Sequence, residues 1–334
     1  MSEKVFASSA FNDNLDSRQR KARIWQTILL ACTLLGILVL TMMLVDIIVD
    51  GAGWLSPTLF NNNHSRFPEK TGMNSAIYGS IYNVLLTALF CFPLGVAAAI
   101  YLEEYAPKSK LTNFINININ NLAGVPSIVY GMLGLTVFGR MFGLFAPESP
   151  LVNFFNLPVE AGNVGGLKFN LFGIPGLIIH LPFGRSLVAG AMTMSLLILP
   201  TVIISSREAI RAVPTSIREA AYGLGATRWQ MIRTQVLPVS FPGILTGIIL
   251  AMGRALGETA PLIIMGAFMY VPFLPRNIWD KFTTMPIQIY NWITLPQPEY
   301  NIHLAAAGII VLLLVLLGMS ALAIFLRNKL QVKW

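Results

Sequence analysis

Residues 219–238 read EAAYGLGATRWQMIRTQVLP, a polar block between two long apolar stretches, 186–204 and 242–270. Each stretch is long enough to cross the hydrocarbon core of a bilayer, which is about 30 Å thick and needs about 20 helical residues. The block between them carries charged side chains and residues that favour helices and turns. We therefore expect a structured loop held against one face of a membrane, where another protein can dock.

The rest of the chain has the composition of a membrane protein. Of its 334 residues, 55% are hydrophobic and only 11% are charged, whereas about a quarter of the residues in soluble domains are charged. We predict an all-α, multi-pass membrane protein with a polar N-terminal tail over residues 1–23. Six transmembrane helices are expected at 24–49, 76–102, 122–145, 186–204, 242–270 and 304–326.

The distribution of Lys and Arg predicts the orientation, because cytoplasmic loops of membrane proteins are enriched in both. With the N-terminus inside, fifteen of the 23 basic residues fall in inner segments and six in outer loops, and Arg140 and Arg254 lie within spans. We therefore expect both termini in the cytoplasm. The net charge of +8 then reflects topology, and the basic residues form no stripe that would indicate binding to nucleic acid.

Two segments outside the spans have unusual patterns. Residues 141–185 form the longest outer loop and are rich in Gly and Pro, with apolar runs such as LFGIPGLII, which suits a segment packed on the membrane or re-entering it. Residues 114–120, FINININ, alternate with the period of a strand. A single strand has no partner there, so we expect a short amphipathic segment on the inner membrane face.

The polar block begins with the signals of a short helix. Ser216 followed three residues later by Glu219 is the capping-box pattern, which predicts a helix start at Ile217. Gly223 and Gly225 predict its end, because glycine readily adopts the left-handed conformation found at helix C-termini.

A second helix is expected directly after this turn. Thr227 and Gln230 repeat the capping-box spacing, and Pro238 predicts the end of this helix because proline lacks a backbone N–H. The small residues Ala220 and Ala221 allow another backbone to approach closely. The block therefore indicates two helices joined by a tight turn, with a surface suited to a protein partner.

This block resembles the EAA motif of bacterial ABC-transporter permeases, and residues 205–241 are hereafter the EAA loop. The resemblance implies a MetI-like type I importer fold in the bacterial inner membrane, with the EAA loop coupling the chain to a cytoplasmic ATPase. Gln235 departs from the motif, which usually has an aliphatic residue there. The motif residues are Glu219, Ala220, Ala221, Gly225, Leu237 and Pro238.

Two further stretches, GVPSIVYGMLGL at 124–135 and GRALGETAPL at 253–262, resemble phosphate-transport permeases of the PstA type, as does Glu103-Glu104-Tyr105-Ala106. The resemblance covers 76–145 and 186–326. It implies a heterodimer with a PstC-like permease, a PstB-like ATPase that binds ATP and Mg²⁺, and a PstS-like binding protein outside. The chain itself lacks the G-x-x-x-x-G-K-[ST] loop that holds nucleotide phosphates, so no cofactor is expected in it.

Arg254 and Glu258 are candidate substrate-pathway residues, because ionisable side chains within a membrane span are costly and are commonly functional. On a continuous helix their spacing of four places them on one face. A guanidinium can bind a phosphate through two hydrogen bonds. The alternative is a structural ion pair between helices.

Small and polar residues in the spans add further candidates. Ser127, at the start of the third span, could donate to an anion, although its hydroxyl could instead bond to its own helix. Span five carries small residues at steps of four, which allow close helix contact either within the chain or at a subunit interface. They are Gly243, Gly247, Ala251 and Ala255.

Three other functions compete with phosphate import. Permeases for phosphonate, sulfate or molybdate share the EAA motif. A secondary transporter would need internal repeats, and an intramembrane enzyme would need a nucleophile with a base or a metal cluster. The sequence has no H-E-x-x-H or G-x-S-x-G pattern. We therefore expect a non-catalytic transport subunit without a metal site.

Overall fold

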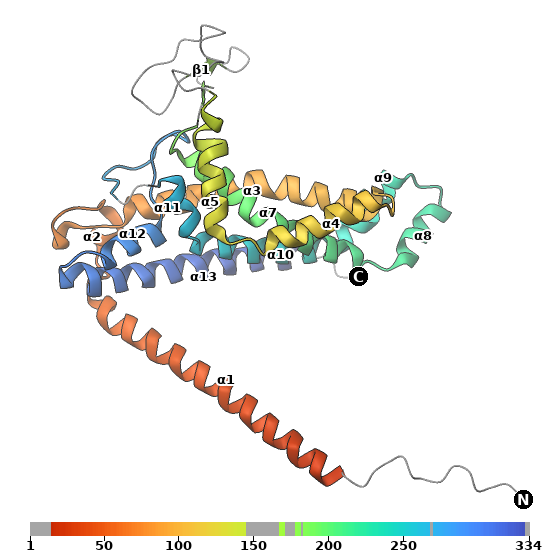
Figure 1. Ribbon diagram of the computed structural model, residues 1–334, viewed down its shortest axis with the longest axis horizontal. Coiled ribbons are helices and arrows are strands. Elements are labelled where there is room, and N and C mark those ends of the chain that lie inside the picture. The colour runs from red at the N-terminus through yellow and green to blue at the C-terminus, as the bar shows by residue number, and fades with distance from the viewer. Residues whose placement is uncertain (1–14, 145–166, 171–177, 182, 268–269, 331–334) are drawn as a thin grey trace, which may run out of the picture.

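The computed structural model describes residues 15–144, 167–170, 178–181, 183–267 and 270–330. The described part is almost wholly helical (Figure 1). Its α-helices are α1 (Leu15–Gly51), α2 (Pro57–Asn61), α3 (Asn74–Ile100), α4 (Lys110–Ala123), α5 (Ser127–Gly134), α7 (Leu187–Arg211), α8 (Thr215–Gly223), α9 (Arg228–Met231), α10 (Leu237–Gly257), α11 (Ala260–Met265), α12 (Met285–Ile293) and α13 (Ala305–Leu330). Short 3-10 turns lie at Ala52–Trp54, Pro68–Lys70 and Met141–Gly143, and π-helical turns at Tyr101–Tyr105, Leu135–Gly139, Ile232–Val236 and Glu299–Leu304.

The number of spans depends on one bent pair of helices. Five continuous helical runs in the described part are long and apolar enough to cross a membrane. They are Ser17–Trp54, Asn74–Tyr105, Leu187–Arg211, Arg228–Gly257 and Glu299–Lys329. A sixth span follows if α4 and α5 together count as one. The all-α, multi-pass prediction is confirmed, whereas the cytoplasmic location of both termini stays a prediction.

Helix α1 diverges from the rest of the molecule (Figure 1). Only the C-terminal end of α1 contacts the other described helices. There Gly51 lies so close to α13 that a Cβ atom would be 2.6 Å from the backbone nitrogen of Ala307. The ring of His303 stacks on Trp54 at 5.8 Å, and its Nδ1 lies 3.1 Å from the carbonyl oxygen of Asp50. The apolar stretch of α1 is exposed along its length, as a lipid-facing helix requires.

Helix α7 forms the centre of the bundle and packs against α3 and α10. Gly243 and Gly247 on α10 face Ala209 and Ser205 on α7, where a Cβ atom would lie closer than van der Waals contact permits. The small-residue ridge of span five therefore packs within the chain, which decides between the two alternatives for this ridge. Ala251 and Ala255 continue the ridge and are buried.

The predicted third span, 122–145, is sharply bent near its start in the part that the structure describes. Residues 110–123 form the amphipathic helix α4, so FINININ is helical, and the chain turns by 103° before Ser127–Gly139. Pro126 explains the break, because proline cannot donate the hydrogen bond that a continuous helix needs and disfavours helical geometry in the preceding residue. Pro126 instead precedes the first residue of α5.

The predicted fifth span, 242–270, is also interrupted. Helix α10 ends at Gly257, Glu258 has extended backbone angles (φ −75°, ψ 128°), and α11 begins at Ala260. A continuous helix would require Pro261 to donate a hydrogen bond to the carbonyl of Gly257, which proline cannot do. Glu258 is therefore outside the helix that carries Arg254.

The region predicted as an outer-loop insertion, 141–185, lies mostly outside the described residues. Its described part includes two short antiparallel strands, β1 (Leu167–Asn170) and β2 (Ile178–Leu181), with Leu167 paired to Leu181. This pair is a small addition to the otherwise helical described fold.

A buried polar cluster joins the loop between α2 and α3 to α12. The side chain of His64 is buried, and its Nδ1 accepts hydrogen bonds from Trp292 Nε1 and Gln288 Nε2, each at 3.0 Å. The Trp292 indole nitrogen can only donate, so Nδ1 must be unprotonated. Burial accordingly lowers the pKa of His64 to about 4.

The cluster predicts that the protein loses stability in acid. The pKa of His64 is about 4 in the folded state and 6.5 as the ordinary value, so below pH 6.5 the unfolded chain binds a proton that the folded chain does not. The free energy of unfolding should fall by up to about 1.4 kcal/mol per pH unit from pH 6.5 down to about 4. Thermal unfolding at a series of pH values measures this slope.

His64→Asn is the matched variant, because its amide oxygen can accept the two hydrogen bonds without titrating. The variant should unfold with a weaker dependence on pH than the parent in that window. Equal slopes in the two proteins would show that His64 does not cause the acid instability.

Candidate functional site

The first helix of the EAA loop, α8, begins at Thr215 and ends at Gly223. The predicted capping box of Ser216 and Glu219 is wrong, because the helix starts after Pro214, which has a preset φ, and both residues lie within it. The predicted turn is confirmed: Gly225 has φ +80°. Any side chain at this position would be strained.

The second helix begins with the predicted capping box. Thr227 Oγ1 accepts from the backbone nitrogen of Gln230 at 3.3 Å, and Gln230 Oε1 accepts from the backbone nitrogen of Thr227 at 2.8 Å. The prediction that Pro238 ends this helix is wrong, since the helical run continues from Arg228 to Gly257. The π-helical turn Ile232–Val236 widens the helix just before Pro238, and such bulges accommodate residues that cannot keep the regular ladder.

The EAA loop has one face packed on the bundle and one that is exposed. Ala221 is buried against the core, as are Met231, Ile232 and Val236, so Gln235 does not disrupt the packed face. Leu224 is 91% exposed. Together with exposed Glu219 and Ala220 and the open space around Gly223 and Gly225, this forms an accessible surface at the helix–turn–helix tip.

Two adjacent glutamates in the π-helical turn Tyr101–Tyr105, which follows α3, bind the arginines of this region. Glu103 Oε1 accepts from Arg207 at 2.7 Å and from Arg211 at 2.8 Å, both at the end of α7. Glu104 Oε1 accepts from Arg218 on α8 at 2.9 Å, with side-chain exposures of only 8% and 18%. Arg218 also donates to the backbone carbonyl of Ile210, in the last turn of α7, and to that of Val213, just after α7. These contacts fix α8 against α3 and α7.

The next residue of the same stretch extends the contact to α9. The guanidinium of Arg228 lies 5.3 Å from the ring centroid of Tyr105, within the range of a cation–π contact. Residues 103–105, hereafter the arginine clamp, therefore contact α7, α8 and α9 in turn. The sequence showed this stretch only as part of a resemblance, and no local spacing indicated that it would meet arginines more than 100 positions away.

The intramembrane pair predicted in span five is present but weak. Arg254 Nε lies 3.3 Å from Glu258 Oε1, with side-chain exposures of 48% and 18%. Within the described residues, the two terminal nitrogens of Arg254 have no hydrogen-bond partner. The guanidinium thus keeps donors free for an anion, while Glu258 holds it from one side.

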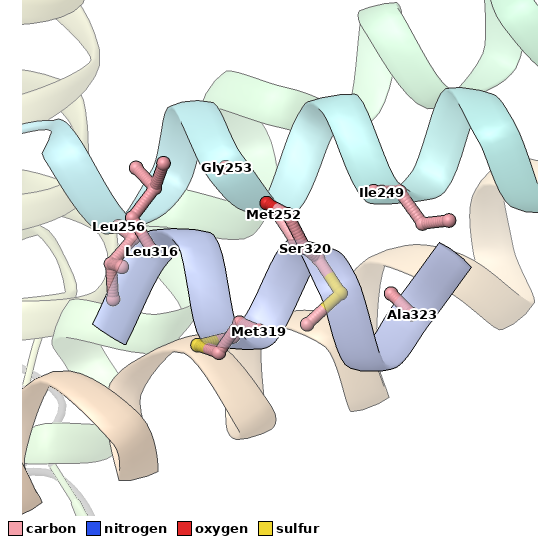
Figure 2. A pocket seen from close by; sticks show the side chains of 8 residues that line it. All are labelled: Ile249, Met252, Gly253, Leu256, Leu316, Met319, Ser320 and Ala323. Atoms are coloured by element: carbon pink, nitrogen blue, oxygen red, sulfur yellow. The ribbon is translucent and has the colours of Figure 1, made fainter. Parts of the chain in front are cut away.

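The side of α10 that faces α13 has a small cleft. Figure 2 shows a cleft between α10 and α13, lined by apolar side chains and Ser320. Its volume is only ≈ 20 Å³, about enough for one water molecule. The cleft is therefore a packing gap between α10 and α13 rather than a route for a phosphate.

Ser127 is the first residue of α5, is partly exposed and makes no hydrogen bond within the described residues. Its hydroxyl is therefore not bonded to its own helix, but the described contacts do not join it to Arg254. One turn on, Gly131 packs on Pro261 of α11, where a Cβ atom would lie 2.7 Å from the proline Cα. The stretches 124–135 and 253–262 thus form one contact surface.

The chain matches a known protein family over most of its length. The family model described as "Binding-protein-dependent transport system inner membrane component" matches residues 91–330. The phosphate transport system permease protein PstA of Yersinia pestis is 31% identical, over 93% of this chain and 92% of that protein. The permease protein PstC of Mesorhizobium japonicum is also 31% identical, over 75% of this chain and 71% of that protein.

A solved structure has the same fold. A chain of a bacterial alginate ABC transporter, crystallised with its periplasmic protein, aligns with a TM-score of 0.63 at 17% identity. The alignment covers 96% of this chain and 99% of that one. The similarity extends over the whole helical architecture described above.

Proposed function

This chain belongs to the binding-protein-dependent transport system inner membrane component family, and we propose that it is the PstA-type subunit of an ATP-driven phosphate importer. It is a non-catalytic permease of the inner membrane with the MetI-like importer fold. The near full-length similarity to a PstA protein supports phosphate as substrate. Importers of phosphonate, sulfate or molybdate are the alternatives.

One observation carries the coupling proposal: a single helical run connects the EAA loop to the intramembrane arginine. From Arg228 to Arg254 the run is about 39 Å long at 1.5 Å per residue. Because it is continuous, a displacement of the loop by a bound ATPase moves the arginine as well. Pro238 does not end the run, so one continuous helix joins the EAA loop to Arg254.

The exposed tip of the EAA loop is the proposed ATPase-binding surface. Glu219 and Ala220 are exposed on α8, Ala221 packs the other face of that helix on the core, and Gly225 forms the turn. Leu237 and Pro238 lie further along the helical run that leaves the turn, at the start of α10. ATP and Mg²⁺ bind to a PstB-like ATPase and not to this chain. A PstC-like permease completes a heterodimer, and a PstS-like protein delivers the anion from outside.

Arg254 is the proposed anion-binding residue of the pathway. Its free terminal nitrogens can bind two oxygens of a phosphate, and a single long contact to Glu258 keeps that binding weak enough for release. Ser127 is a second donor on the packed surface of α5 and α11.

The function is tested by purifying the tagged chain from membranes and measuring both its partners and phosphate uptake. We expect an ATPase subunit to co-purify, and vesicles holding the complex to take up labelled phosphate only when ATP is present on the EAA-loop side. Sulfate and molybdate in excess should not compete. A chain that transports phosphate without an ATPase would refute the proposal.

A further inference from the structure

An open depression of ≈ 510 Å³ lies between the π-helical turn Tyr101–Tyr105, the start of α4 and the end of α7. Helices α4 and α7 pack side by side here (Figure 1). The Asn116 side chain on α4 accepts a hydrogen bond from Arg207 on α7 at 2.8 Å. The lining therefore comes from three elements held by specific contacts.

The lining carries an excess of positive charge. Four cations, Lys108, Lys110, Arg207 and Arg211, face one carboxylate, that of Glu103, which leaves three positive charges. Glu103 is already shared by the two arginines, at 2.7 and 2.8 Å. The two lysines are exposed and make no ion pair within the described residues. The net positive charge of the lining therefore favours the binding of an anion.

The start of α4 adds backbone donors to the same place. Ser109 caps this 14-residue helix, and its hydroxyl accepts from the backbone nitrogen of Thr112 at 3.2 Å. The amide groups of Lys110 and Leu111 precede the hydrogen-bonded part of the helix, and the helix dipole favours negative charge there. Combined with the lysines and with Arg211, these donors suit an anion with several oxygens.

We propose that this depression, the inner anion site, binds a phosphate-bearing anion, either a phospholipid headgroup or free inorganic phosphate. Exposed Leu111, Phe114 and Ile117 follow on α4, which places apolar surface beside the lysines as a lipid would require. The proposed function places the arginine clamp on the inner face of the membrane. Glu103 belongs both to the clamp and to this site, so the position of the site on the inner face rests on the proposed function. An anion here competes with Glu103 for Arg211.

The test measures anion binding by the purified transporter complex containing the full chain. Native mass spectrometry compares the binding of phosphatidylglycerol with that of zwitterionic phosphatidylcholine. A second experiment measures how strongly inorganic phosphate, or vesicles of phosphatidylglycerol, protect Lys108 and Lys110 from acetylation. In Lys108→Gln/Lys110→Gln, phosphatidylglycerol should bind about 25-fold more weakly, since each lysine at a membrane surface contributes about fivefold. The control Lys21→Gln/Lys329→Gln removes the same charge elsewhere and should bind like the parent.

The acetylation experiment distinguishes a phospholipid headgroup from free inorganic phosphate. Protection by vesicles of phosphatidylglycerol assigns the site to a headgroup, and protection by inorganic phosphate alone assigns it to the free anion. If neither protects the lysines and all variants bind phosphatidylglycerol equally, the inner anion site does not exist. Acetylation is measured on the unaltered chain and requires no transport, so this result is independent of whether the complex imports phosphate.

Discussion

Arg254→Ala is expected to lower phosphate uptake by roughly tenfold to a hundredfold, because hydrogen bonds from a charged donor contribute about 1.5–3 kcal/mol. The loss follows from the geometry of the pair: the free terminal nitrogens of Arg254 are the groups that would bind phosphate, and alanine removes them. Uptake of labelled phosphate by vesicles of matched transporter content measures the effect.

Arg254→Lys separates charge from shape. Lysine keeps the positive charge but loses the planar pair of donors, so uptake should fall between those of the parent and of Arg254→Ala. Arg140→Ala, which removes a charge at the far end of the third span, should retain parental uptake. If both Arg254 variants import phosphate like the parent, this arginine is structural and the pathway assignment is wrong.

Arg218→Gln is expected to uncouple ATP hydrolysis from transport by disrupting the arginine clamp. The side chain is largely buried and donates to Glu104 and to the carbonyls of Ile210 and Val213. Removing one partner of a buried ion pair typically costs about 3–5 kcal/mol. We expect uptake to fall at least tenfold while hydrolysis by the ATPase continues, because the tip of the EAA loop remains but α8 is no longer fixed to α3.

Glu104→Gln is the complementary variant. It should have a smaller effect than Arg218→Gln, because Arg218 retains its two carbonyl acceptors, and the double variant should lose less than the sum of the two single losses. Glu69→Gln, which removes an exposed glutamate from the 3-10 turn Pro68–Lys70, is the matched control and should transport normally. Additive losses would mean that the two side chains act separately rather than as a clamp.

Local chemistry in the sequence predicted the parts of the site that depend on neighbouring residues. The capping box of Thr227 and Gln230 and the left-handed Gly225 were found as expected, because both depend on contacts within three residues. The same reasoning failed for the capping box of Ser216 and Glu219, because the helix starts earlier, after Pro214. It also failed for Pro238, where a π-helical turn keeps the helix continuous. Near Pro261 the error is the reverse: one helix was predicted over 242–270, but α10 ends at Gly257, and Glu258 lies outside it.

The sequence by itself determined that the chain is a helical membrane protein with a helix–turn–helix loop, because apolar length and capping residues act over one span or one turn. The tertiary structure alone decided which charges meet. Glu104 and Arg218 are 114 positions apart, and nothing in their spacing favours a contact. They meet because α3 and α7 pack closely, and a largely buried charge at their common end must be paired to avoid the cost of desolvation.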